Sequence, residues 1–223
     1  MNSRPSKKNC VLTAVYLILT LLIGIFVVLL PLNGIECDIV LDLQNLIQRT
    51  IGLQAFQILT YLGDFYFWII LAISYLLYAY FKSRKQSDSA IELAFFLVIT
   101  TALTYFIKMV FARPRPDCSG ITVYDEDVIS SFSYPSGHVS RATGAYMILS
   151  KGSRTKESLA MIAISVVSLS RIILGAHYLT DIVGGTFLSL AAQKLTNLSL
   201  PLLKRRIERW RGSAGDASIA SRI

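Results

Sequence analysis

The sequence predicts an all-α membrane protein, a bundle of six transmembrane helices with one amphipathic helix on its outer side. Hydrophobic residues make up 53% of the 223 residues and charged residues only 16%, whereas soluble domains carry about a quarter charged residues. The apolar residues also gather in runs of about 20, the length that crosses a bilayer as a helix. The same composition excludes a disordered chain, which needs low hydrophobicity and high charge. Three cysteines exclude a disulfide scaffold.

The first three spans follow from long apolar runs. Residues 11–32 are uncharged and too long for the apolar core of a signal peptide, so we expect a retained signal anchor. A second span is expected at about 65–81. A third is expected at about 91–111, where Glu92 and Lys108 fall near opposite ends.

Three further spans complete the predicted bundle. The fourth is expected to begin at Pro135, because proline suits the first turn of a helix, and to end near Ser150. The fifth and sixth are expected at about 158–176 and about 179–198. An even number of spans places both termini on the same side of the membrane.

Basic residues predict which side that is. One set of loops, with both ends of the chain, holds most of the lysines and arginines, and the other set holds most of the acids. The basic set is Arg4, Lys7, Lys8, Lys82, Arg84, Lys85, Lys151, Arg154, Lys156, Lys204, Arg205, Arg206, Arg209 and Arg211. Because basic loops stay in the cytoplasm, we expect both termini there and the acidic loops outside the cell membrane. We interpret residues 1–203 as one membrane domain and 204–223 as a basic, partly disordered tail rather than a nucleic-acid-binding segment.

Residues 35–50 are predicted to form the amphipathic helix. Polar residues on one face and apolar residues on the other recur at helical spacing: Asp38, Asp42, Asn45 and Arg49, against Ile39, Leu43, Leu46 and Ile47. This helix either lies along the outer interface or packs on the bundle. Cys37 and Cys118 both fall outside, and the sequence leaves open whether they form a disulfide. The acidic run 125–127 indicates a solvated loop, because it lacks the spacing of an EF-hand calcium site.

Charged and polar residues within the spans indicate a functional site, because they are costly there. The residues concerned come from four spans and fall near the outer side; they are Lys108, His138, Arg141, Arg171, His177 and Asp181. The chain's only two histidines share this depth with the cations, which snorkelling of a single Lys or Arg does not explain. An anion-transport path would spread its cations across the membrane, so the pattern favours a site.

The spacing of these residues fits the binding of a phosphate. Lys108 and Arg115 are seven residues apart, which is two helical turns, so both side chains can face the same way. Together with Arg171 they would surround a phosphate group. The backbone N–H groups of Ser136 and Gly137, at the start of a helix, would complete the anion site.

The two histidines fit phosphoryl transfer. Asp181 follows His177 by four residues, so its carboxylate can orient the imidazole and fix its tautomer. His177 would attack phosphorus as the nucleophile, and His138 would protonate the leaving group and then activate water. With both histidines in these roles, no metal or other cofactor is expected. Arg141, three residues after His138, contacts either the substrate head group or an acid of the outer loop.

These residues resemble the motifs of the type 2 phosphatidic acid phosphatase superfamily, which also includes the vanadium haloperoxidases. The family's motifs are Lys-x6-Arg-Pro, Pro-Ser-Gly-His and Ser-Arg-x5-His-x3-Asp. Here they read, in the family's order, Lys108 to Arg115-Pro116, Pro135-Ser136-Gly137-His138, and Ser170-Arg171 to His177 and Asp181. The resemblance covers about residues 108–181 firmly. It implies an all-α bundle, a phosphohistidine at His177 and catalysis without a metal.

A site at the outer leaflet suits a lipid whose head group lies at the interface, and the resemblance implies that this lipid carries a phosphate. We favour a polyprenyl diphosphate, and phosphatidate, phosphatidylglycerol phosphate and phosphorylated glycolipids are the alternatives. A lipid hydroxyl as acceptor instead of water would make the protein a phosphotransferase. A haloperoxidase is less favoured because the pocket would need bound vanadate, and an anion transporter is the remaining alternative. The expected partners are the bilayer and its lipid phosphate, without nucleic acid, and the oligomeric state stays open.

Overall fold

All regular elements in the described part of the chain are helices, as the sequence predicts. The computed structural model describes residues 7–30, 33–50, 52–82, 87–117, 120 and 131–220. The elements are α1 (Lys7–Leu29), α2 (Asn33–Thr50), α3 (Leu53–Leu59), the 3-10 helix η1 (Thr60–Gly63), α4 (Phe65–Lys82), α5 (Ser87–Phe111), α6 (Gly137–Ser150), α7 (Arg154–Ile173) and α8 (Leu179–Ala220).

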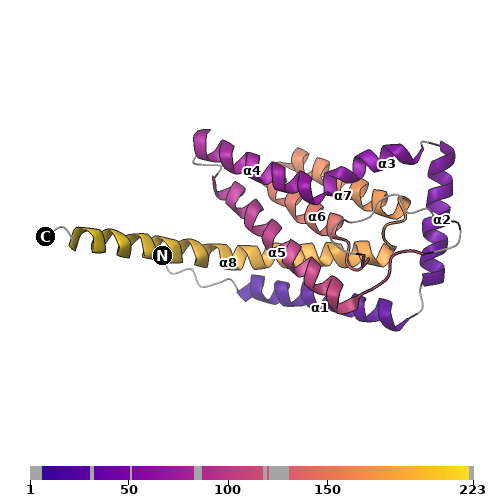
Figure 1. Ribbon diagram of the computed structural model, residues 1–223, viewed down its shortest axis with the longest axis horizontal. Coiled ribbons are helices and arrows are strands. Elements are labelled where there is room, and N and C mark those ends of the chain that lie inside the picture. The colour runs from indigo at the N-terminus through magenta and orange to yellow at the C-terminus, as the bar shows by residue number, and fades with distance from the viewer. Residues whose placement is uncertain are drawn as a thin grey trace.

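The long helices lie side by side, and α2 crosses one end of them (Figure 1). α1 packs along α8, while α6 contacts α5, α7 and α8. α1, α5 and α7 run toward the end that α2 crosses, and α4, α6 and α8 run away from it. The last turns of α5 and α7 and the first turns of α6 and α8 therefore meet beside α2.

Two helices are long and apolar enough to cross a membrane, namely α1 and residues Asp88–Phe111 of α5. A third candidate is the segment Leu53–Gly63 combined with α4, a pair bent by 45°. In the described residues, length and hydropathy thus identify two or three spans where the sequence analysis expects six. α6 falls short because it has only 14 residues and buries polar side chains such as Ser140 and Thr143. The topology of six spans stays a prediction.

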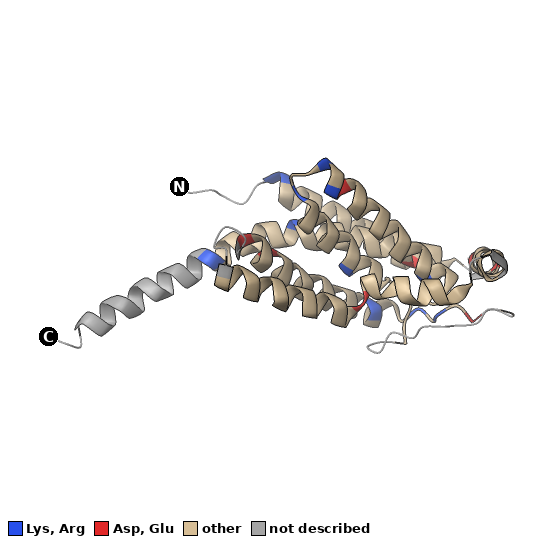
Figure 2. Ribbon diagram, turned by 90° about the horizontal axis from the view of Figure 1, so that it is seen from above, with Lys and Arg blue, Asp and Glu red and all other residues tan. Residues whose placement is uncertain are grey.

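Charged residues lie mostly toward the two ends of the long helices (Figure 2). In α4 the one charged residue is Lys82, at the last position, and in α1 the charged residues are Lys7 and Lys8, at the first two. The middle parts of the described helices therefore carry few charged residues, as burial in a bilayer favours.

Small residues let α6 lie in the middle of the bundle. The helix is buried from Gly137 to Ala145. A Cβ on Gly144 would lie 2.2 Å from the ring of Phe96, so only glycine permits this contact between α6 and α5. A Cβ on Gly185 of α8 would lie 2.8 Å from the backbone oxygen of Ser136. α8 therefore approaches the start of α6 at backbone distance.

The buried face of α2 differs from the predicted one. Glu36, Val40 and Gln44 follow one another at one-turn spacing and are at most 5% exposed. Leu46, which the periodicity assigns to the apolar face, is 58% exposed. α2 contacts α7, so it packs on the bundle. Its placement along the outer interface stays a prediction. Its inward face carries polar residues because Glu36 has polar partners there.

Three other expectations concern the cysteines, the acidic loop and the domain boundary. Cys37 is disulfide-bonded and Cys10 is free, whereas Cys118 and the acidic run 125–127 lie outside the described residues. α8 continues past residue 203 to Ala220, so no helix end marks the boundary expected there.

We expect Gly185→Ala to lower the stability of the protein by roughly 1–3 kcal/mol, because its methyl group would press on the Ser136 carbonyl and separate α6 from α8. Thermal unfolding in detergent measures the loss. The matched control is Gly34→Ala in α2, where a Cβ meets nothing within 4 Å; its unfolding midpoint should stay level or rise. Equal midpoints for the two variants would contradict this packing.

Candidate active site

The residues singled out from the sequence all lie at the end of the bundle that α2 crosses. Lys108 is in the last turn of α5, and Arg115 is in the segment that follows the helix. Ser136 caps α6, Arg171 is in the last turn of α7, and Asp181 is in the first turn of α8. Gly137, His138 and Arg141 lie in the first turns of α6, and His177 lies in the connection between α7 and α8. Ser136, Arg171, His177 and Asp181 are fully buried.

A buried imidazole and a buried carboxylate face each other at the start of α8. His177 Nδ1 lies 3.4 Å from Asp181 Oδ2, and the backbone N–H of Tyr178 donates to the same oxygen at 2.9 Å. The N–H groups of Ala176 and His177 donate to the Arg171 carbonyl at 3.1 and 3.2 Å, which fixes the connection to the end of α7. With Nδ1 turned to the carboxylate, Nε2 is the ring nitrogen that can reach a substrate.

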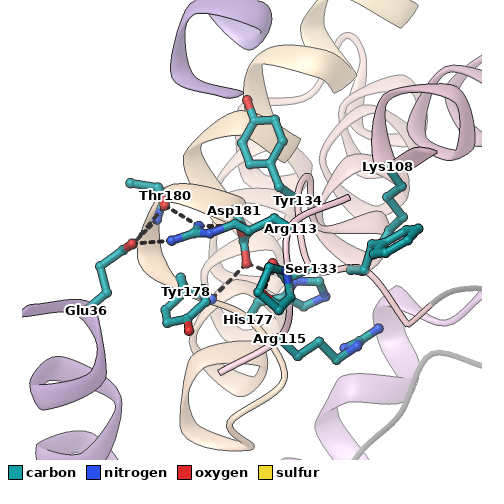
Figure 3. A network of polar contacts seen from close by, with 12 residues as sticks. Glu36, Lys108, Arg113, Arg115, Ser133, Tyr134, His177, Tyr178, Thr180 and Asp181 are labelled. Atoms are coloured by element: carbon teal, nitrogen blue, oxygen red, sulfur yellow. Dashed lines mark hydrogen bonds and ion pairs between the residues drawn. The ribbon is translucent and has the colours of Figure 1, made fainter. Parts of the chain in front are cut away.

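Arg113 joins this pair to α2, and the sequence analysis missed it. Its guanidinium lies 2.7 Å from Asp181 Oδ1 and 2.6 Å from Glu36 Oε2, with 4% of the residue exposed (Figure 3). The N–H and hydroxyl of Thr180 donate to Glu36 Oε1 at 2.9 and 2.8 Å. The guanidinium carbon also lies 4.0 Å from the centre of the Tyr178 ring, a distance at which cation–π attraction operates.

One guanidinium lies between two carboxylates in this network. Burial alone would lower the pKa of Arg113, but the carboxylates of Asp181 and Glu36 outweigh burial and raise its pKa. The guanidinium therefore stays charged, and its ion pair with Asp181 orients that carboxylate toward His177.

The three predicted phosphate ligands hydrogen-bond to three different segments of the chain. Arg115 donates to the Ala176 carbonyl at 3.0 Å, directly before His177. Arg171 donates to Thr60 Oγ1 in η1 at 3.0 Å. Lys108 donates to the carbonyl of Phe132, in the segment that leads to α6. Of the three cations, Arg115 contacts the connection that carries His177. The partners of Arg171 and Lys108, which are Thr60 and Phe132, were not expected.

The backbone N–H of Ser136, expected to bind an anion, already has a partner within the protein. This N–H donates to the backbone oxygen of Asp181 at 3.0 Å, so it does not point to an anion. The Ser136 hydroxyl is buried and has no hydrogen-bond partner in the described part of the chain, so it is the group available to a ligand. A Cβ on Gly137 would come within 3.1 Å of Arg141 NH1, so this glycine leaves room for the guanidinium.

His138 faces a carboxylate that the sequence analysis did not single out. Its Nε2 lies 4.0 Å from Asp64 Oδ2. The other oxygen of Asp64 accepts hydrogen bonds from the N–H groups of Tyr66 and Phe67 at 2.7 and 3.3 Å, which caps α4. Asp64 is therefore fixed at the start of α4 and can orient His138.

Two sequence signals pointed to the missed residues. Arg113 belongs to a repeated Arg-Pro pair with Arg115, and Glu36 shares the four-residue spacing of Val40 and Gln44. Both were counted among the loop charges, where no local pattern assigns a partner. Within the described residues, no group of three or more His, Cys, Asp or Glu side chains is placed to hold a metal ion.

Comparison with known proteins adds a family and a fold. The sequence profile described as "PAP2 superfamily" matches residues 89–204. The chain is 34% identical over 121 residues to the decaprenylphosphoryl-5-phosphoribose phosphatase of Mycobacterium tuberculosis. The matched residues make up 54% of this chain and 64% of that protein. It is 31% identical over 182 residues to the undecaprenyl-diphosphatase of Sulfolobus acidocaldarius, covering 78% and 85%. The chain thus matches less than two thirds of the length of the mycobacterial relative.

Two solved structures share the arrangement of helices. A transmembrane PAP2-type phosphatidylglycerolphosphate phosphatase from Bacillus subtilis superposes with a TM-score of 0.69 at 23% identity, covering 83% of this chain and 94% of that one. Aquifex aeolicus LpxE superposes with a TM-score of 0.54 at 23% identity, covering 70% and 93%. The likeness to a transmembrane protein and the apolar helices together support a location in a membrane.

We expect Arg113→Met to destabilise the protein by about 3–5 kcal/mol, because it leaves two buried carboxylates without their countercharge. The double variant Arg113→Met/Glu36→Gln should recover part of the loss, since it removes one of the two charges. Chemical unfolding in detergent compares the variants. Arg115→Met is the matched control: Arg115 is only partly buried and should change stability little. An Arg113→Met protein as stable as this control would show that the network does not hold the site.

Proposed function

Because the chain belongs to the PAP2 superfamily, we propose that it is a membrane-embedded lipid phosphatase that works through a phosphohistidine at His177. The observation that carries the proposal is the buried pair of His177 and Asp181, 3.4 Å apart, with the Arg115 side chain bonded to the Ala176 carbonyl directly before His177. A buried imidazole whose Nδ1 is held by a carboxylate presents Nε2 as a nucleophile. The surrounding cations fit a substrate that carries phosphate.

Binding comes first in the proposed reaction. Lys108, Arg115 and Arg171 hold the oxygens of the phosphate to be transferred, and the buried Ser136 hydroxyl with Gly137 completes the site. Arginine suits two oxygens at once and lysine a single one. These cations stabilise the charge that spreads over the phosphoryl oxygens in the transition state.

Two steps then transfer the phosphoryl group. His177 Nε2 attacks phosphorus, the bond from phosphorus to the leaving oxygen breaks, and His138 gives that oxygen a proton. His138 next takes a proton from water, which attacks the phosphohistidine and releases inorganic phosphate. Asp181 stabilises the positive charge on His177 during attack, and Asp64 orients His138 at 4.0 Å.

Substrate and topology follow from chemistry and relatives together. We favour a polyprenyl diphosphate, a choice supported by the undecaprenyl-diphosphatase that matches 78% of this chain. Residues 1–203 form the membrane domain with six spans, both termini are cytoplasmic, and the site faces outward. The distribution of basic residues supports this orientation.

A panel of detergent-solubilised lipid phosphates, assayed for phosphate release with excess EDTA, tests the function. We expect a polyprenyl diphosphate to give the highest kcat/KM and the chelator to leave the rate unchanged, because no step uses a metal. Measuring phosphorylated lipid acceptors in the same samples separates hydrolysis from phosphotransfer. A rate abolished by EDTA and restored by a divalent cation would contradict the proposal.

Substitutions of the two histidines test their roles. We expect His177→Ala to lower kcat by about 10³-fold or more, since the nucleophile is lost. His138→Ala should lower kcat by about 10²–10⁴-fold, the contribution of a general acid and base. Steady-state kinetics measure each loss, and unchanged unfolding midpoints show that the fold persists. Near-normal turnover of His177→Ala would refute the mechanism.

A further inference from the structure

Arg141 lies between the candidate active site and an apolar groove. It follows His138 by one helical turn on α6 and is 5% exposed. Its Nε donates to the Gly63 carbonyl at 3.4 Å, and its guanidinium carbon lies 5.6 Å from the centre of the Phe65 ring. NH1 reaches back to within 3.1 Å of where a Cβ on Gly137 would lie. One guanidinium thus touches the start of α6 and the start of α4.

The groove runs between α4 and α5 and has a volume of about 800 Å³, within the roughly 300–1,000 Å³ of ligand pockets. Its walls are aliphatic and aromatic and include Ile69, Ile73, Leu97, Val98, Tyr105 and Phe106. Arg141 is the one charged residue among the described residues that line it. It lies at the end formed by Phe65 and Met109, which is the end nearer the site. The groove therefore suits a hydrocarbon chain that carries an anion at one end.

In the proposed reaction the leaving group extends from the site toward this groove. In an in-line transfer the leaving oxygen lies opposite His177 and therefore beside His138, which protonates it. The segment of Gly63 and Asp64 contacts His138: a Cβ on Gly63 would lie 3.0 Å from the His138 Cβ, and the Asp64 carboxylate lies 4.0 Å from its Nε2. The same Gly63 binds Arg141. A leaving group that extends away from His138 along this segment meets Arg141 before it enters the groove.

We propose that Arg141 binds the phosphate that stays on the lipid when a lipid diphosphate is hydrolysed, and that the groove between α4 and α5 holds the lipid's hydrocarbon chain. The inference rests on the proposed function and names the substrate feature that the same site selects. His177 attacks the terminal phosphorus, and the bond from that phosphorus to the bridging oxygen breaks. The bridging oxygen keeps the electron pair and takes the proton of His138, so the leaving group is an anionic lipid monophosphate.

A lipid monophosphate offers no such anion. Its leaving group is an alcohol, which is neutral once His138 has protonated it, so Arg141 has no charge to stabilise beside it. Arg141 therefore raises kcat/KM for diphosphates above that for monophosphates with the same chain. The other reading of Arg141, pairing with an acid of the outer loop, gives no reason for the two substrates to differ.

The test compares farnesyl diphosphate and farnesyl monophosphate in mixed micelles. The readout is the ratio of their kcat/KM values. We expect Arg141→Gln to lower this ratio by about 10- to 100-fold, the effect of losing hydrogen bonds between two charged groups. The control Arg115→Gln should slow both substrates and keep the ratio within about threefold, because Arg115 holds the phosphate common to both. If Arg141→Gln unfolds, Arg141→Lys, which keeps the charge, should show an intermediate ratio.

A second variant tests the groove. Ala102→Trp fills it from α5 and should raise KM for undecaprenyl diphosphate by about tenfold relative to farnesyl diphosphate, the equivalent of about two buried methylene groups. An unchanged ratio of diphosphate to monophosphate in a folded Arg141 variant overturns the role of Arg141. Equal effects on long and short chains overturn the role of the groove. A wild-type protein that releases phosphate from neither lipid overturns the proposed function itself.

Discussion

The ion pairs of the buried Arg113 with Asp181 and Glu36 are the interaction on which the rest of the site depends. Their side chains are 3%, 0% and 6% exposed, and removing each ion from water costs several kcal/mol. Short contacts offset that cost only when the remaining oxygens also have donors, which Thr180 and the Tyr178 N–H supply. The position of the carboxylate that faces His177 therefore depends on α2, a helix that carries none of the motif residues.

α6 connects this network to the apolar groove between α4 and α5. At its start the Ser136 N–H is bonded to the Asp181 backbone, while His138 faces Asp64 and Arg141 faces the groove. Such close approach requires glycine where helices meet at backbone distance, as at Gly185. The first turns of α6 thus connect the segment of Asp181 with His138, the proposed general acid, and with Arg141, the proposed ligand of the leaving group.

The parts of the site that follow local spacing could be predicted from the sequence, and the parts that depend on distant partners could not. His177 and Asp181 are only four residues apart, so the chain keeps them close although His177 precedes the first residue of α8. Arg113 is 77 residues from Glu36 and 68 from Asp181, and no periodicity encodes such a pair. The start of a helix usually offers free N–H groups, so the Ser136 N–H was expected to face an anion. It bonds instead to the Asp181 backbone of α8, and no local pattern in the sequence indicates that contact. Likewise, apolar runs indicate a membrane protein. The number of spans is harder to predict, because helices that bury polar residues have lower hydropathy than lipid-facing ones.

The central claim is that His177 carries the phosphoryl group, and mapping the phosphoenzyme tests it most directly. Wild-type and His138→Ala proteins are mixed with lipid diphosphate, quenched in alkali to preserve phosphohistidine, digested and analysed by mass spectrometry. We expect phosphate on the peptide that contains His177, at higher occupancy in His138→Ala because hydrolysis of the intermediate is slowed. Phosphate on the peptide of His138 in the wild-type protein, or on no histidine while substrate is turned over, would contradict it.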